Sequence, residues 1–428
     1  MINEDYKKAI WNLVDTGRGI TDPRNTLDII TTVATCALLN QERFTHIKNM
    51  GANAIIPALN EVILELRKKY KTAFEHCTEI NILPESVITR IVYSIASFED
   101  LSAFAPAIRE LLIDHAGKHG QFGSTAYMEK LITKLVGDAS QKTLLDAACG
   151  LARTSSLIKT KQTFLQELFL ESASLSNRLL LLEGKNLEIF TGNSLSEFKF
   201  EGKKFDLVVM EPPLAQKFES NFRTELEHSP FIITEQGKSI PTSAGDAIWM
   251  QFALHQLNET GKAYLVLPQG CLFRGGYDAA VREHLLNHEL VDYIVALPSG
   301  VLNGTGIEPV LLVLDKAKVK GSPIRFIDIR DIGHKNKFHI ELSKSDLEEI
   351  SGLVNGDIAD ESKAKNVTIR EIRQTESDNT GNNLNISKYV YVDEVIEIPN
   401  MAEQLKMLAQ YQQYFEQTQQ ELLTLLNQ

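Results

Sequence analysis

The apolar run Phe205–Met210 leads directly into Glu211, Pro212, Pro213 and Leu214. Two prolines after a buried strand fix a rigid turn, because each locks φ and lacks an N–H donor. Carbonyl oxygens are then left as acceptors beside the Glu211 carboxylate. Such acceptors suit an exocyclic amino group whose hydrogens must be held while its nitrogen attacks an electrophilic methyl. A purely structural Pro-Pro turn is the alternative interpretation of this tetrapeptide.

Two earlier segments also end in residues that suit a ligand. The run LLDAACG (144–150) ends in an acid and small residues, Asp146, Ala148, Cys149 and Gly150. Small residues let the backbone approach a ligand, and we expect a helix to follow whose N-terminus offers free N–H donors. Glu167 ends the next apolar run, where a carboxylate can accept two hydrogen bonds from a ribose diol. Taken singly, the first segment is more often a structural turn, and a Glu at a strand end is more often a solvated charge.

These residues follow short apolar runs that are separated by helix-like spacers. The runs are Thr143–Ala147, Thr163–Leu168, Leu187–Thr191, Phe205–Met210, Ala263–Leu267, Val291–Leu297 and Val310–Leu314. Strands this apolar predict a parallel sheet buried on both faces, that is, an α/β doubly wound fold. Because such sheets bind ligands beyond the carboxyl ends of their strands, the residues after each run should share one site.

The parts that flank this sheet read as helical. Residues 1–110 show helical spacing, as in Ala54 to Leu66, and Thr21-Asp22-Pro23 is typical of a helix start. After Pro399 an apolar seam runs from Met401 to Leu425, which is either a packing face or a dock for another chain. We therefore predict a helical domain at 1–110, an α/β domain at 111–395 and a C-terminal assembly helix at 396–428.

Composition narrows the class of protein. Of the 428 residues 43% are hydrophobic and 23% charged, which is typical of a globular chain. The formal net charge of −12 disfavours sequence-blind DNA binding through the overall field, but it is compatible with a local basic groove or a basic partner. The sequence contains no run of 18 apolar residues, so we expect no membrane-spanning segment. The acidic start and four scattered cysteines indicate a reducing cytoplasm, without a zinc cluster.

In their order along the chain, the motifs resemble a known family. The chain is similar to the modification (methylase) subunit of type I restriction–modification systems, an adenine amino-methyltransferase that depends on S-adenosylmethionine. The resemblance runs through WNLVDTGRGI (11–20), GQFGST (120–125), the strand motifs, LPQGCLFRGG (267–276), VDYIVALPSGVLNGTGIEPVLLVLDKA (291–317) and NNLNISKYV (382–390). Each piece is modest, but the ordered set is specific and covers nearly the whole chain.

The resemblance implies a role for each matching residue. The cofactor site would comprise Phe122, Thr125, Asp146, Ala148, Cys149, Gly150, Glu167 and Asn193. Within it, Glu167 matches the ribose-binding acid, and Asn193 stands where the family usually has an Asp beside the cofactor's adenine. The catalytic loop would be Glu211, Pro212, Pro213 and Leu214, where the family has Asn-Pro-Pro-Phe or Asn-Pro-Pro-Tyr. No metal is required.

The departures from the family lie at these same positions. The second and third glycines of the family's loop are missing, and a Cβ at Ala152 narrows the backbone approach and disfavours positive φ. The helix after that loop should be short. Glu211 is one methylene longer than the usual amide, and a misplacement of ~1 Å can cost ~10²-fold in rate. Leu214 replaces a ring whose stacking on a base contributes ~1–3 kcal/mol.

The sequence thus predicts a DNA adenine methyltransferase of a type I-like system, which flips its target base out of the duplex. Its expected partners are double-stranded DNA, a specificity subunit docked on the terminal helix, a restriction subunit and a second copy of the chain. One alternative is a catalytically degenerate subunit that keeps the fold as a DNA-binding or assembly scaffold. Another is a small-molecule or protein methyltransferase, against which the Pro-Pro motif argues.

Overall fold

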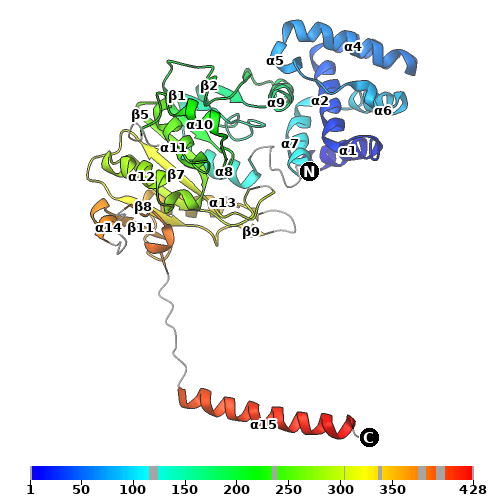
Figure 1. The fold of residues 1–428 in the computed structure, drawn as a ribbon. Coiled ribbons are helices and arrows are strands. Elements are labelled where there is room, and N and C mark those ends of the chain that lie inside the picture. The colour runs from blue at the N-terminus through cyan, green and yellow to red at the C-terminus, as the bar shows by residue number, and fades with distance from the viewer. Residues whose placement is uncertain are drawn as a thin grey trace. The chain divides into compact units, whose positions relative to one another are not determined.

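The computed structural model divides the chain into two units, Met1–Val390 and Tyr391–Gln428, which are described separately (Figure 1). The residues that the structure describes are 2–114, 124–233, 239–302, 304–335, 340–374, 382–391 and 401–426.

The first part of the chain is helical, as the spacing of its apolar residues predicts. Asp22 caps the second helix, accepting a hydrogen bond from the Arg24 backbone N–H at 2.8 Å, and Pro23 occupies the first turn. These helices bury a shared apolar core. They are α1 (Ile2–Thr16), α2 (Pro23–Leu39), α3 (Gln41–Lys48), α4 (Ala52–Lys69), α5 (Lys71–Phe74), α6 (Glu85–Ile95) and α7 (Phe104–Asp114), with 3-10 turns at Ile80–Ile82 and Leu101–Ala103.

A nine-stranded sheet follows, and its strand order is β11-β8-β6-β7-β5-β4-β1-β2-β3. The strands are β1 (Ala139–Asp146), β2 (Thr160–Glu167), β3 (Ile189–Thr191), β4 (Phe205–Met210), β5 (Leu257–Pro268), β6 (Val291–Ala296), β7 (Pro309–Asp315), β8 (Ile324–Asp328) and β11 (Ala364–Val367). All seven predicted strands are present. A separate two-stranded sheet consists of β9 (His334–Lys335) and β10 (Ile340–Glu341).

The sheet is mostly, not entirely, parallel, so the prediction of a parallel sheet needs correction. Strands β1 to β5 pair in parallel, but β7 is antiparallel to both β5 and β6, and β11 is antiparallel to β8. Residues 297–308, between β6 and β7, contain no helix in their described part. Without a helical crossover the chain cannot return to the start of the sheet, so β7 runs back beside β6.

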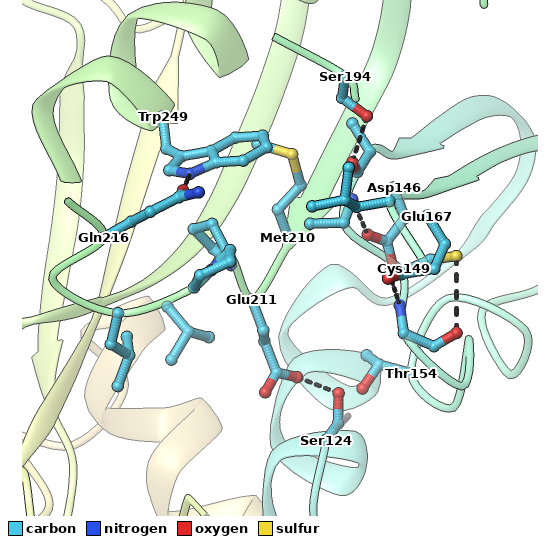
Figure 2. Close-up of a pocket in the computed structure, with 18 of the residues that line it drawn as sticks. Ser124, Asp146, Cys149, Thr154, Glu167, Ser194, Met210, Glu211, Gln216 and Trp249 are labelled. Atoms are coloured by element: carbon cyan, nitrogen blue, oxygen red, sulfur yellow. Dashed lines mark hydrogen bonds between the residues drawn. The ribbon is translucent and has the colours of Figure 1, made fainter. Parts of the chain in front are cut away.

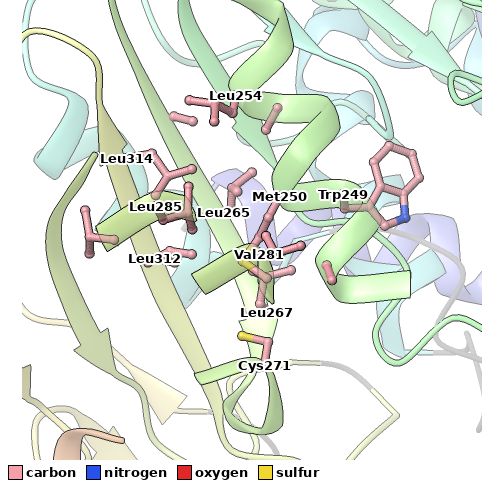
Figure 3. Close-up of a cluster of buried hydrophobic side chains, with 14 of the residues drawn as sticks. Trp249, Met250, Leu254, Leu265, Leu267, Cys271, Val281, Leu285, Leu312 and Leu314 are labelled. Atoms are coloured by element: carbon pink, nitrogen blue, oxygen red, sulfur yellow. The ribbon is translucent and has the colours of Figure 1, made fainter. Parts of the chain in front are cut away.

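Helices cover both faces of the sheet. Successive side chains of each strand point to opposite faces, so an apolar strand presents apolar side chains on both faces, and both must be buried. The remaining helices are α8 (Ala126–Val136), α9 (Leu170–Leu182), α10 (Ser220–Leu226), α11 (Gly245–Gln256), α12 (Tyr277–Asn287), α13 (Lys344–Asn355) and α14 (Ile369–Gln374), with 3-10 turns at Gln269–Leu272 and Ile386–Lys388. On one face α11 and α12 pack Met250 and Val281 over Leu265 and Leu312 (Figure 3). On the other face α8 and α13 cover the alternate residues, such as Val266.

Two buried arginines join the helical part to the sheet. Arg178 of α9 is fully buried, pairs with Asp28 of α2 and donates to the carbonyl of His76 at 2.7 Å. Arg109 of α7 pairs with Glu183 at the end of α9. Removing one partner of such a buried pair leaves an unpaired charge and costs ~3–5 kcal/mol. The helical part and the sheet together belong to one compact unit, Met1–Val390. A boundary near residue 110 within this unit stays a prediction.

The second unit contains α15 (Met401–Leu426), the helix predicted after Pro399. All of its described side chains are exposed, including Leu408 and Phe415 of the predicted seam. Within the described residues, no helix has both the length and the apolarity to cross a bilayer.

Candidate functional site

A cavity of about 560 Å³ opens at the carboxyl ends of β1, β2 and β4 (Figure 2). From β1 the chain proceeds to β2 on one side, whereas β4 pairs with its other side, so the cavity lies at the topological switch point of the sheet. Its lining includes most of the residues predicted from sequence: Asp146, Ala148, Cys149, Gly150, Glu167, Asn193, Glu211, Pro212, Pro213 and Leu214.

Two predicted site residues are not placed in this cavity. Thr125 is the N-cap of α8, where its hydroxyl accepts from the Met128 N–H and donates to the Val301 carbonyl at 2.6 Å. Thr125 therefore positions a helix and is not among the lining residues, whereas its neighbour Ser124 is. Phe122 lies outside the described residues.

The loop after β1 differs from its prediction. Residues 151–159 form turns and no helix follows, so the helix N-terminus expected to supply N–H donors is absent from this described segment. Ala152 adopts a positive φ of 51°, although its Cβ was expected to disfavour such a backbone conformation. A non-glycine residue in this region carries strain of about 1 kcal/mol. Hydrogen bonds to the loop backbone offset it, including Ser176 Oγ to the Gly150 carbonyl at 2.9 Å.

Glu167, at the end of β2, stabilises the loop after β1 through hydrogen bonds to backbone N–H groups. Its carboxylate accepts from the Gly150 N–H at 2.9 Å and from the Phe169 N–H at 3.1 Å. Burial raises the pKa of Glu167, although both backbone hydrogen bonds act to lower it. Each carboxylate oxygen keeps a second lone pair, so Glu167 can still accept from a diol.

Asp146, at the end of β1, is the most strongly perturbed carboxyl of the cavity. Burial raises its pKa to about 8, against the opposing effects of the Ser155 hydroxyl and the Ala148 N–H. The Ala148 N–H lies 3.3 Å from Oδ1. Asp146 is therefore mostly protonated at neutral pH and can donate a hydrogen bond as well as accept one.

Asn193 follows β3 and is half-buried at the cavity wall. Its side-chain oxygen accepts from the Leu195 N–H at 3.0 Å. The neighbouring Ser194 hydroxyl donates to the Ala147 carbonyl at 2.6 Å, which ties this loop to the end of β1 (Figure 2). The amide nitrogen of Asn193 has no hydrogen-bond acceptor in the described part of the chain and is available to a ligand.

Glu211 accepts a hydrogen bond from the Ser124 hydroxyl (Figure 2). Burial raises the pKa of Glu211 to about 7, while Ser124, Thr154 and the charge of Arg153 act to lower it. The Thr154 hydroxyl lies beside the carboxyl but is buried without a partner in hydrogen-bond geometry among the described residues. The Ser124–Glu211 contact was not predicted, because a contact between residues 87 positions apart leaves no sequence signal, and nothing in the sequence singled out Thr154.

The segment Gly245-Asp246 at the start of α11 fixes the loop that follows β4. The Ala215 N–H donates to Asp246 at 3.0 Å, and the Trp249 indole N–H donates to the Gln216 side chain at 2.9 Å. Asp246 also pairs with Arg274, which ties the loop to the segment after β5. A Cβ on Gly245 would lie 2.4 Å from the Gln216 carbonyl oxygen, so only glycine permits this approach.

A comparison with protein families shows which family this chain belongs to. Residues 107–397, which include the whole sheet and its cavity, match the model of the N-6 DNA Methylase family. The chain belongs to the N-6 DNA methylase family.

The chain is similar to methylase subunits of type I restriction enzymes. It is 30% identical over 186 residues to the MpnII subunit of Mycoplasma pneumoniae, covering 44% of this chain and 33% of that one. It is 25% identical over 446 residues to the MjaVIII subunit of Methanocaldococcus jannaschii, covering 96% of this chain and 71% of that one. The chain thus spans only a third of the length of the first relative.

The fold is also found in a solved structure. The type I restriction–modification methyltransferase subunit of Streptococcus thermophilus superposes with a TM-score of 0.75 at 20% identity, covering 91% of this chain and 99% of that chain. At this identity the likeness concerns the fold, and the roles of the cavity residues must be argued from their own chemistry.

Proposed function

We propose that this N-6 DNA methylase transfers a methyl group from S-adenosylmethionine to the exocyclic amino group of adenine in DNA, as the modification subunit of a type I restriction–modification-like system. The observation that carries the proposal is a single cavity at the switch point of the sheet. It combines cofactor-type carboxyls, Asp146 and Glu167, with the acceptor loop Glu211-Pro212-Pro213.

The residues present fit S-adenosylmethionine. A cavity of about 560 Å³ is within the range of ~300–1,000 Å³ typical of small-molecule sites. Glu167 would accept from the ribose hydroxyls, Asn193 would bond the adenine, and Asp146 with the 148–150 loop would hold the methionine end. The orphaned Thr154 hydroxyl offers one more hydrogen bond to a ligand. When bound, the cofactor supplies an electrophilic methyl on a sulfonium.

The chain's own contribution to the reaction is to hold the amino group. The target adenine must leave the stack to reach the cavity. There the Glu211 carboxylate and the Pro212 carbonyl accept the two amino hydrogens and keep the nitrogen lone pair free. Ser124 fixes the carboxyl from the side, which compensates for the longer side chain. Glu211 accepts most strongly when its carboxyl is ionised, so its raised pKa makes this step depend on pH.

Duplex DNA, a specificity subunit, a restriction subunit and a second copy of the chain are the partners we propose, with α15 as the dock for another subunit. The name "methylase subunit" that the relatives carry supports assembly into a larger enzyme. The many exposed apolar side chains of α15 support it as well.

A second function, a scaffold without catalysis, is favoured by one specific observation. Glu211 already has a hydrogen-bonding partner in Ser124, and Leu214 offers no ring to stack on a flipped base. In that case the methyltransferase fold would serve assembly or DNA binding alone.

Calorimetric titration of the purified chain with S-adenosylmethionine separates the two functions. We expect saturable binding, weakened about tenfold by Glu167→Gln, since a hydrogen bond to a charged group contributes ~1.5 kcal/mol. Glu171→Gln removes a nearby exposed carboxylate outside the cavity and should not change the affinity. Absence of binding to the wild-type chain would establish the scaffold. Transfer of labelled methyl to adenine, measured with a specificity subunit, then tests the reaction.

A further inference from the structure

A second cavity, of about 990 Å³, lies where the N-terminal helices meet the edge of the sheet. Its walls are the end of α4 with α5, the first residues of β2, and the segments that precede β3 and β4. Thr160 at the start of β2 lines this cavity, whereas Glu167 at its end lines the candidate functional site. Because eight strand residues span ~25 Å, the two cavities are separate sites.

The charge of this second cavity is opposite to that of the chain. Its lining contains the lysines Lys69, Lys71, Lys161, Lys185, Lys199 and Lys203, and we name the cavity the lysine cleft. Its described lining includes one acid, Glu188, which accepts from the Thr72 hydroxyl at 3.1 Å. Lys185 pairs with Glu183 at 3.1 Å, but the other five lysines have no ion pair within the described residues. So many uncompensated cations in a chain of net charge −12 indicate a site for an anion.

Aromatic rings orient two lysines of the cleft, Lys199 and Lys203. The Lys199 ammonium lies 5.2 Å from the centroid of Phe190, and that of Lys203 lies 5.6 Å from the centroid of Phe164. Both rings contact Phe200 edge-on, with centroids 5.6 and 5.1 Å away, and Phe200 is buried. The rings are therefore fixed by the core, and their cation–π contacts orient two ammonium groups before any ligand binds.

We propose that the lysine cleft binds the phosphodiester backbone of a single nucleic-acid strand. Lysines alternating with half-buried aromatic rings are typical of single-strand sites, in which cations follow the phosphates and bases stack on rings. A duplex keeps its bases stacked inside the helix, so it could use the lysines of the cleft but not the rings. An acidic protein segment would use the lysines but would leave Phe164, Phe190 and Tyr70 without a partner.

The test measures binding of a fluorescein-labelled 12-nucleotide single strand by anisotropy, without S-adenosylmethionine, at several salt concentrations. The variant Lys161→Ala/Lys199→Ala/Lys203→Ala removes three cleft cations. The matched control Lys8→Ala/Lys344→Ala/Lys365→Ala removes three exposed lysines elsewhere and makes the same change in net charge. All six side chains are exposed, so neither variant should alter the melting temperature.

We expect the cleft variant to bind at least tenfold more weakly at low salt and the control to bind as the wild type does. The salt dependence should fall by about 2 in log–log slope, since each single-strand phosphate contact contributes ~0.7. Replacing the three cleft lysines by arginine should restore binding. Equal weakening in both triple-alanine variants would overturn the proposal. Tighter binding of a 12-residue polyglutamate than of the oligonucleotide would also overturn it. So would stoichiometric binding of ATP by a chain that does not bind the single strand. Because no methyl transfer is measured, an inactive methyltransferase would leave this result unaffected.

Discussion

At the scale of single residues, Glu211 decides whether the proposed reaction runs. Burial of its carboxyl raises its pKa to about 7, although the hydrogen bond from Ser124 acts to lower it. An amide at this position accepts equally at every pH, whereas a carboxyl accepts most strongly when it is ionised. The family's usual residue and Glu211 therefore differ in pH dependence as well as in length.

The first prediction follows from this pKa. The rate of methyl transfer at saturating cofactor should increase with pH and reach a plateau above about pH 7. Well below that value, the rate should drop about tenfold for each unit by which the pH is lowered. Glu211→Gln, which cannot ionise, should flatten this limb of the profile. Ser124→Ala removes a hydrogen bond that favours the charged form, and should move the midpoint to higher pH. A wild-type midpoint near 4.5 would show that Glu211 is solvated during turnover.

Asp146 gives a second prediction, on stability. Its folded-state pKa of about 8 is above its ordinary value of 3.8, so the folded chain binds a proton that the unfolded chain releases. The free energy of unfolding should therefore decrease as pH rises from about 4 to about 8, by up to ~1.4 kcal/mol per pH unit from this group. Urea unfolding at pH 5.5 and pH 8 should show this loss, and Asp146→Asn should reduce it. Equal losses in both proteins would refute the assignment to Asp146.

At the scale of elements, the start of α11 fixes the position of the proposed catalytic loop after β4. A Cβ at position 245 would meet the Gln216 carbonyl oxygen at 2.4 Å, and the backbone there cannot rotate away as a side chain would. Gly245→Ala should push the loop outward by a large fraction of an ångström and lower kcat by ~10- to 100-fold. Binding of S-adenosylmethionine should change little, because Asp146 and Glu167 belong to other loops.

Gly275→Ala is the control for this third prediction. Gly275 has no heavy atom within 4 Å of its ideal Cβ position, so the added methyl meets open space. Its kcat and melting temperature should match those of the wild type. A Gly245→Ala enzyme with unchanged kcat would mean that the loop is not rigidly held by α11.

Elements also show how far the sequence could predict this structure. The seven apolar runs identified their strands because each is buried, whereas β11 (AKNV) is too short and polar to be recognised. The antiparallel β7 could have been inferred from the lack of a helical pattern in residues 297–308. The turns at 151–159 could not, because Ala152 adopts a positive φ that its side chain disfavours. The Ser124–Glu211 contact depends on tertiary packing, which spacing does not encode.

At the scale of the whole molecule, charge is distributed unevenly. The chain carries a net charge of −12, yet five lysines without an ion pair in the described part of the chain line one cleft. At the candidate functional site the titratable groups Asp146, Glu167 and Glu211 are acidic, and burial raises the pKa of each. Partial neutralisation of Asp146 and Glu211 at pH 7 lowers the repulsion that DNA phosphates would meet there. Attraction for nucleic acid must then come from separate surfaces, such as the lysine cleft or a partner subunit.

The last prediction concerns α15, which belongs to a unit apart from the first 390 residues. Its apolar seam includes Leu405, Leu408 and Phe415, which are 58%, 55% and 68% exposed. A lone helix with such a seam needs a partner to bury it. Deleting residues 401–428 should therefore abolish association with a second copy or a specificity subunit, measured by light scattering, and leave the melting temperature unchanged. Leu408→Glu should weaken association without removing the helix, whereas Gln413→Glu introduces the same charge on the opposite face of the helix and should not. A melting temperature lowered by several degrees with association intact would mean that the seam packs on its own chain.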